Sequence, residues 1–217
     1  MARASKHPVA PRVSAPDLPN HLDDAEPARG ADLVQRQLPR LVGEVELSYA
    51  TLEEVRIPGA DVASLALRGA TLVDVDIDDI RAVEVIARDA SLRRVRIHGG
   101  RIATLDLADA RIAELELRGL RIDYLRLAAA ELEDVLIADC TIGTIDLPRA
   151  RLTRVAFDGS RADEVDPREM RATDLDLRGL DALSYLDPLA LRGATLTEEQ
   201  VRILAPAFAV AAGIDVQ

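Results

Sequence analysis

The chain has 217 residues, a formal net charge of −11, and 48% hydrophobic but only 2% aromatic residues. Its apolar residues are enough for a sizeable core, and the single cysteine excludes a disulfide framework and a multi-cysteine zinc module. The negative charge argues against nucleic acid or anionic lipid as a direct partner, and no apolar run is long enough to cross a membrane. We therefore expect a bacterial protein in a reducing cytoplasm.

Residues 1–40 form a leader that we expect to be mostly flexible, because it shows no regular period and is rich in proline. Its basic start lacks the apolar segment of a secretory signal. Leu33, Leu38 and Leu41 are candidates to cover the beginning of the following domain. The leader prolines are Pro8, Pro11, Pro16, Pro19, Pro27 and Pro39.

Residues 41–189 repeat every five residues. From Leu47 to Ala182 every fifth residue is non-polar, at 28 consecutive positions without a slip. A period of five fits neither an α-helix nor a simple strand. A second non-polar position lies two residues before each of these. There bulky residues alternate with small ones, which are alanine at six sites spaced twenty apart: Ala50, Ala70, Ala90, Ala110, Ala130 and Ala150.

The superperiod of twenty predicts a solenoid with four sides of five residues each. Each side directs two side chains inward and three outward, and residues 45–184 make seven coils stacked at the strand spacing of about 4.8 Å. One corner favours glycine, as a turn with positive φ would. The glycines that share this site are Gly59, Gly99, Gly119, Gly159 and Gly179.

Four short stretches carry a resemblance to a known family. Each places a small, a polar and an aliphatic residue in sequence: Ala60-Asp61-Val62, Ala70-Thr71-Leu72, Ala90-Ser91-Leu92 and Ala110-Arg111-Ile112. This pattern resembles the pentapeptide-repeat family, over about two thirds of the chain. The resemblance implies an all-β fold, a right-handed quadrilateral β-helix of about seven coils. The sequence departs from the family pattern where arginine precedes the central aliphatic residue and where half of the small sites hold Val, Leu or Ile.

Residues 190–217 are expected to form a short C-terminal helix that begins after Thr197, with Gln200 completing a capping box. Pro206 should kink or split this helix. Val201, Leu204 and Phe208 fall on one helical face. This face either caps the open end of the core or makes a homodimer contact, and the sequence alone leaves both possibilities open.

We find no catalytic constellation, no cofactor motif and no metal site in the sequence. His98 is expected on the surface beside the glycine corner, and Cys140 at a small inward site as a buried structural thiol. The run from Asp74 to Asp79 resembles the start of a calcium loop, but Asp79 and Val85 stand where that loop needs Gly and Glu. We therefore expect an acidic surface patch there.

Outward charges sort into columns in the twenty-residue frame. One column, the acidic column, holds five acids and is interrupted by Arg94 and Arg154. Its acids are Glu54, Asp74, Glu114, Asp134 and Asp174, and Glu53 and Glu133 lie beside it. Together these acids are our candidate partner-binding residues: Glu53, Glu54, Asp74, Glu114, Glu133, Asp134 and Asp174. A second column, the basic stripe, contains Arg81, Arg101, Arg121 and Arg161. Alternation of stacked charges could be purely structural, since like charges at strand spacing repel.

The sequence favours a non-enzymatic protein that acts as a rigid protein-interaction scaffold. A narrower alternative follows from the resemblance: the quinolone-resistance members of the family are acidic DNA mimics that bind DNA gyrase and modulate it. The basic stripe argues against such mimicry. A third interpretation, an enzyme or ligand-binding β-helix, requires a cleft or converging polar groups that we do not find in the sequence.

Overall fold

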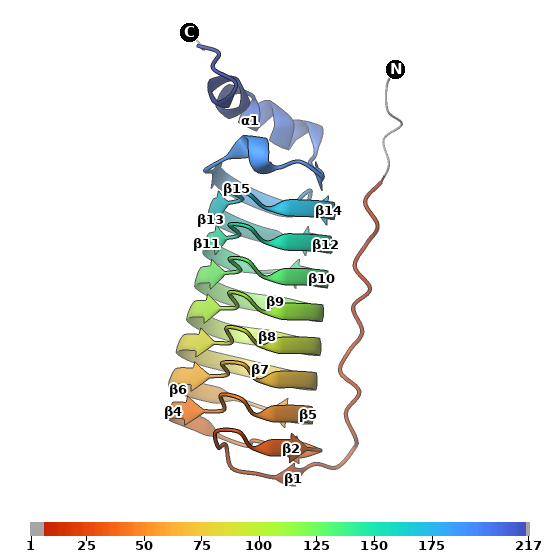
Figure 1. Cartoon of the computed structure of the whole chain (residues 1–217), viewed down its shortest axis with the longest axis vertical. Helices are drawn as coiled ribbons and strands as arrows, with labels where there is room; N and C mark the ends of the chain where they lie inside the picture. The colour runs from red at the N-terminus through yellow and green to blue at the C-terminus, as the bar shows by residue number, and fades with distance from the viewer. Residues whose placement is uncertain (1–6, 216–217) are drawn as a thin grey trace.

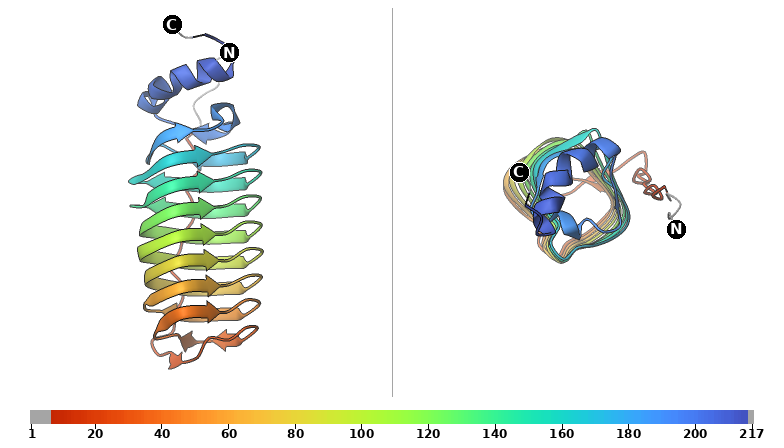
Figure 2. Two further views of the ribbon diagram at one scale, coloured as in Figure 1. Left: turned by 90° about the vertical axis from the view of Figure 1, so that its left-hand side faces the viewer. Right: turned by 90° about the horizontal axis from the view of Figure 1, so that it is seen from above.

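Strands that stack in parallel, coil upon coil, make up most of residues 7–215, the part of the chain that the computed structural model describes (Figure 1). The strands join into one sheet that winds through about eight coils. Seen from above, the coils superimpose on a roughly square outline (Figure 2). The predicted all-β solenoid with a short C-terminal helix is confirmed, with about eight coils in place of seven.

The strands have the following bounds in chain order. The first half contains β1 (Asp23–Asp24), β2 (Asp32–Val34), β3 (Arg36–Gln37), β4 (Leu41–Glu46), β5 (Thr51–Ile57), β6 (Ala60–Ala66), β7 (Thr71–Ile86) and β8 (Ser91–Asp106). The second half contains β9 (Arg111–Arg126), β10 (Glu131–Ala138), β11 (Thr141–Asp146), β12 (Arg151–Asp158), β13 (Ser160–Asp166), β14 (Arg171–Asp176), β15 (Leu180–Tyr185) and β16 (Ala194–Thr195).

The register between neighbouring coils is the predicted shift of twenty residues. Leu72 pairs with Leu92 across β7 and β8, and Leu92 pairs with Ile112 across β8 and β9. From β5 to β15 the coils thus stack identical positions of the repeat on one another, whereas the pairings of β2 with β5 and of β14 with β16 are shifted by nineteen. The core follows directly, because both predicted inward columns are buried: Leu72, Leu92, Ile112, Leu132 and Leu152 in one, Ala70, Ala90, Ala110, Ala130 and Ala150 in the other.

Left-handed backbone conformations mark three corners of most coils. One corner column has φ between 51° and 62° at Glu54, Asp74, Arg94, Glu114, Asp134, Arg154 and Asp174. The expected glycine corner is only partly of this kind. Gly99, Gly119 and Gly159 have positive φ, whereas Gly59 and Gly179 do not. At Gly179 the reason for glycine is space, since a Cβ there would collide with the Phe157 carbonyl oxygen.

The solenoid begins earlier in the chain than residue 41. Strands β2 and β3 both pair with β5, and β1 pairs with β3, so part of the leader forms an additional first coil. Leu33, Leu38 and Leu41 are buried in this coil, as expected for residues that cover the first predicted turn.

Residues 7–22, which we call the strap, take an unexpected path. They leave the first coil and run in an extended conformation along the outside of the solenoid, back toward its C-terminal end (Figure 1). The view from above places the strap beside the square outline, outside the core (Figure 2). That the leader is mostly flexible stays a prediction; the sequence contained no indication of this path.

At the other end, a short 3-10 helix, η1 (Pro188–Ala190), leads to α1 (Glu198–Ala211), which lies across the last coil (Figure 2). Thr197 and Gln200 form the predicted capping box. We expected Pro206 to kink the helix or to split it. A split does not occur, because α1 continues through Pro206. Pro206 is exposed, so water can bind the Arg202 carbonyl that lacks its usual N–H donor.

Candidate partner-binding surfaces

The acidic column is a corner of the solenoid, and its backbone conformation accounts for part of its composition. All seven of its positions have positive φ. Aspartate tolerates this left-handed conformation better than most residues, because its short polar side chain can bond locally. Three of the positions are aspartate: Asp74, Asp134 and Asp174. The column therefore has a conformational reason for these acids, independent of any partner.

The arginines that interrupt the column neutralise the aspartates one coil before them. Arg94 donates through Nε to Asp74 Oδ1 at 2.6 Å, and through Nη2 to the second carboxylate oxygen. Arg154 makes the equivalent pair with Asp134, with an Nε–Oδ1 distance of 2.7 Å. Such two-point pairs are among the stronger charged contacts. Between these two pairs lies Glu114, for which the described residues 7–215 provide no arginine ion pair.

The strap covers the middle of this column. The backbone N–H of Arg12 donates to Asp134 Oδ1 at 2.9 Å, and that of Asp17 donates to Asp74 Oδ1 at 3.0 Å. Between them, Ser14 Oγ donates to Glu114 Oε2 at 2.9 Å. Asp74 and Asp134 are consequently only 4% and 8% exposed. We had expected both to be open to a partner.

These contacts lower the pKa of both aspartates. For Asp74 the hydrogen bond from Arg94 is the main cause, burial opposes it, and the N–H of Asp17 adds to the lowering. For Asp134 the hydrogen bond from Arg154 leads, again against burial and with help from the N–H of Arg12. Both carboxylates are therefore charged acceptors at neutral pH.

The remaining candidate acids differ in their surroundings. Glu54 is half-buried and accepts a 2.7 Å hydrogen bond from Gln35 Nε2. Asp174 is half-buried at the far end of the column. Glu53 and Glu133 are exposed on the adjoining side, where Glu133 contacts Arg154. The structure thus aligns the acids but leaves only some of them open.

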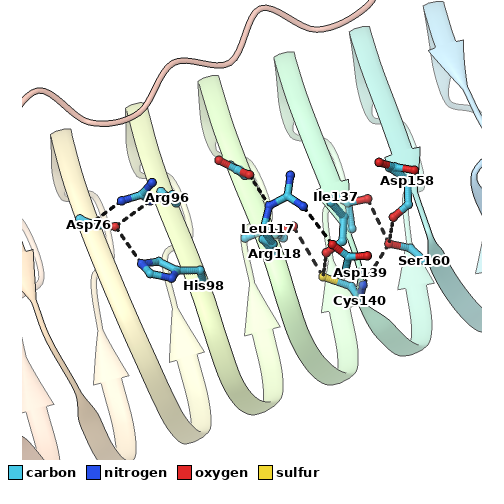
Figure 3. Close-up of polar contacts among 12 residues, drawn as sticks. Asp76, Arg96, His98, Leu117, Arg118, Ile137, Asp139, Cys140, Asp158 and Ser160 are labelled. Atoms are coloured by element: carbon cyan, nitrogen blue, oxygen red, sulfur yellow. Dashed lines mark hydrogen bonds and ion pairs between the residues drawn. The ribbon is translucent and has the colours of Figure 1, made fainter.

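A second ion cluster lies on the next side of the solenoid, within the expected acidic patch (Figure 3). Arg96 binds both oxygens of Asp76, at 2.9 and 3.0 Å, and His98 Nε2 lies 3.2 Å from Asp76 Oδ1. Asp76 is buried, not exposed as we expected, and His98 is half-buried. Burial raises the pKa of Asp76, but Arg96 and its other charged neighbours outweigh this and lower it. The twenty-residue frame could have revealed this cluster, since Asp76 and Arg96 share a column.

Cys140 is buried, as predicted, and lies beside Ser160 at a corner (Figure 3). Its Sγ is 3.2 Å from the Ala138 carbonyl oxygen, and Ser160 Oγ accepts from the Cys140 N–H at 3.1 Å. Ser160 Oγ also lies 3.0 Å from the Ile137 carbonyl oxygen. Burial raises the pKa of the thiol. Both side chains therefore satisfy backbone groups where the chain turns, and the thiol is held in its protonated form.

The basic stripe is open. Arg81, Arg101 and Arg121 pair in register on successive coils, and all are exposed. Asp123 reaches Arg101 at 2.9 Å and Arg121 at 3.8 Å. Asp61 of the preceding coil pairs in register with Arg81, so the three stacked arginines form a basic run with acids at its border.

The terminal helix has two different faces. Leu204 is buried and Phe208 is partly buried against the last coil, whereas Val201 is 47% exposed. Ile203 and Val210, two turns apart along the helix, are exposed. Gln200 Nε2 donates to the Leu177 and Leu180 carbonyl oxygens at 2.7 and 2.8 Å, so the helix start closes part of the open strand edge.

A shallow cleft lies between α1 and the last coil. Its lining includes Arg178, Asp181, Tyr185 and Ile203. Burial raises the pKa of Tyr185 to about 12, so its hydroxyl stays protonated at neutral pH. Within residues 7–215, no three His, Cys, Asp or Glu side chains are grouped so as to hold a metal ion. Over the same range, no helix has the length and apolar character needed to span a bilayer.

The sequence matches no protein-family model, and a search of curated proteins finds no relative.

Proposed function

We propose that this chain is a non-enzymatic protein-interaction scaffold of the pentapeptide-repeat type. The basic stripe is the observation that carries the proposal. Parallel pairing holds Arg81, Arg101 and Arg121 on successive coils, at the strand spacing of about 4.8 Å. The residues before and after each of these arginines face the core, which keeps the backbone of the stripe rigid. A partner can therefore bind without a loss of backbone conformational entropy. The partner chemistry that fits is an acidic protein surface.

The experiment is capture of partners from the native host by the full chain. Replacing Arg81, Arg101 and Arg121 by Gln should abolish retention of the specific partner. The matched control replaces Arg111, Arg151 and Arg171 by Gln, because these exposed arginines also lie twenty or forty residues apart but on another side. Retention that is equal for both triple variants contradicts the stripe as the binding surface.

The alternative is an acidic DNA mimic that binds DNA gyrase and modulates it. This function needs an acidic column that a basic groove can reach. The exposed Glu53 and Glu133 favour it, whereas Arg94, Arg154 and the strap occupy the aspartates between them. A mimic of this kind would therefore work only once the strap had moved away.

We further propose that α1 makes a homodimer contact while it also caps the core. Leu204 packs on the last coil, whereas Ile203 and Val210 on the same helix are exposed. Exposed aliphatic residues spaced seven apart on one helix are suited to packing against a second helix.

A further inference from the structure

The strap binds the solenoid mainly through its backbone. Its two N–H donors, on Arg12 and Asp17, each directly follow a proline, Pro11 and Pro16. The only side-chain donor that reaches the column from the strap, among the described residues, is Ser14. Backbone donors are common to all peptides, so this corner recognises an extended conformation and the spacing of its donors more than particular side chains.

The spacing of donors and acceptors matches. Asp74 and Asp134 lie three coils apart along the corner, about 14 Å at the usual strand spacing. Arg12 and Asp17 are five residues apart, about 16 Å in the polyproline conformation, which rises about 3.1 Å per residue. A helix would cover only about 8 Å with the same five residues. Only an extended peptide can bridge the two carboxylates in this way.

The prolines of the strap prepare it for this role. Pro8, Pro11, Pro16 and Pro19 restrict the backbone to extended forms before it binds, so less conformational entropy is lost on docking. Asp74 and Asp134, held by Arg94 and Arg154, are pre-positioned acceptors with lowered pKa values. Both sides of the contact are therefore organised in advance.

We propose that the corner from Asp74 to Asp134 is a binding site for an extended, proline-containing peptide and that the strap is its built-in occupant. A partner protein with two Pro-X units five residues apart replaces the strap. Replacement is opposed by the tether, because a short flexible linkage raises the local strap concentration to about the millimolar range. The existence of a protein partner rests on the proposed function, whereas the peptide site itself does not.

The first test weakens the contact of the strap and leaves the solenoid residues of the site unchanged. In the full chain, the double variant Arg12→Pro and Asp17→Pro removes both N–H donors and keeps the strap extended. A fluorescent peptide with the sequence of residues 7–22 should bind this variant with a Kd at least about tenfold lower than its Kd for the wild type. A hydrogen bond to a charged group is strong enough to account for a tenfold difference. The control variant, Arg12→Ala and Asp17→Ala, keeps both N–H groups and should behave as the wild type.

Adding Asp74→Gly and Asp134→Gly to the proline variant should abolish peptide binding. Glycine accepts the positive φ at both positions, so the corner can keep its shape without the acceptors. Asp174→Gly is the matched control in the same column and conformation, beyond the strap contacts. Peptides with Pro-X units four, five or six residues apart should bind best at five. Equal binding at all spacings, or equal binding of a peptide with proline at both donor positions, overturns the proposal.

Hydrogen exchange on the full chain gives a second readout that needs no added peptide. The amides of Arg12 and Asp17 should exchange at least about tenfold faster in the Asp74→Gly and Asp134→Gly variant than in the wild type. Unchanged exchange at both amides overturns the strap contact itself. If peptides bind as expected but no partner is captured from the host, the peptide site stands and the proposed function fails.

Discussion

At the scale of single residues, the inward positions of each pentad do most to stabilise the protein. Ile112 and Ala110 stack on equivalent residues of the coils before and after them, and both are nearly inaccessible to water. A side chain in such a column has close neighbours on both sides along the axis. Neither a smaller nor a larger replacement can be accommodated without disturbing several coils.

Changing Ile112 to Ala should lower the free energy of unfolding by about 2–5 kcal/mol, because it leaves a cavity in the column. Changing Ala110 to Leu should cost about 1–3 kcal/mol through overpacking. The neighbouring Arg111 is exposed, so Arg111→Ala should change stability by no more than about 0.5 kcal/mol. Urea unfolding of the three variants measures these values. Three equal effects would contradict the assigned inward register.

Asp74 and Asp134 make stability depend on pH. Their folded-state pKa values lie below the ordinary value, so both carboxylates bind protons less readily in the folded chain. They contribute stability above about pH 4, and this contribution is lost as the pH falls through their lowered pKa values. Unfolding midpoints at pH 7, 5 and 3 should fall mainly in the last interval. The fall should be smaller for the Asp74→Asn and Asp134→Asn variant, and an identical fall would contradict the assignment.

At the scale of elements, the two ends of the solenoid are closed in different ways. The first coil, with Leu33 and Leu38, covers the N-terminal end of the core. At the other end α1 covers it with Leu204, and Gln200 binds two carbonyl oxygens of the last coil. An exposed strand edge is a template for further pairing, so both closures protect against aggregation.

Replacing Ile203 and Val210 by Asp should convert a dimer to a monomer without unfolding the chain, because both side chains are largely exposed. Size-exclusion chromatography with light scattering measures the mass. Deleting residues 196–217 should instead cause aggregation, since it uncovers the last coil. A wild-type mass that corresponds to a monomer would contradict the dimer, and a soluble, equally stable truncation would contradict the cap.

At the scale of the whole molecule, an acidic column and a basic stripe both run along the axis of the solenoid. The net charge of −11 coexists with an open basic stripe and with an acidic column that the strap partly covers. Each coil contacts only its neighbours, as in other repeat proteins. A change on one of these surfaces therefore need not alter the other. The strap covers part of the acidic column, and the arginines of the basic stripe stay exposed.

A supercoiling assay with purified gyrase tests the acidic column as a DNA mimic. If the column acts in this way, the Arg12→Pro and Asp17→Pro variant should affect gyrase at lower concentration than the wild type. Changing Asp74, Glu114 and Asp134 to Arg should abolish the effect, and added salt should weaken it by screening. The absence of any effect from both proteins, at concentrations well above that of the enzyme, would contradict gyrase as the partner.

The sequence by itself determined the solenoid, its twenty-residue register, the inward columns and the capped C-terminal helix. Each of these depends on local periodicity and on burial that repeats identically in every coil. The burial of Cys140 followed from the same frame. The frame also places Asp76 and Arg96 in one column, but it directs both outward and so does not predict that Asp76 is buried.

Only the tertiary structure decided what covers the outside. The strap has no period, and its contact with Asp74 and Asp134 joins residues 57 and 122 positions apart. A backbone donor leaves no trace in the choice of side chain, so no residue pattern in the strap could identify its acceptor. The outward columns are periodic because the coils are periodic. Which column stays accessible to water depends on the strap, which has no repeat.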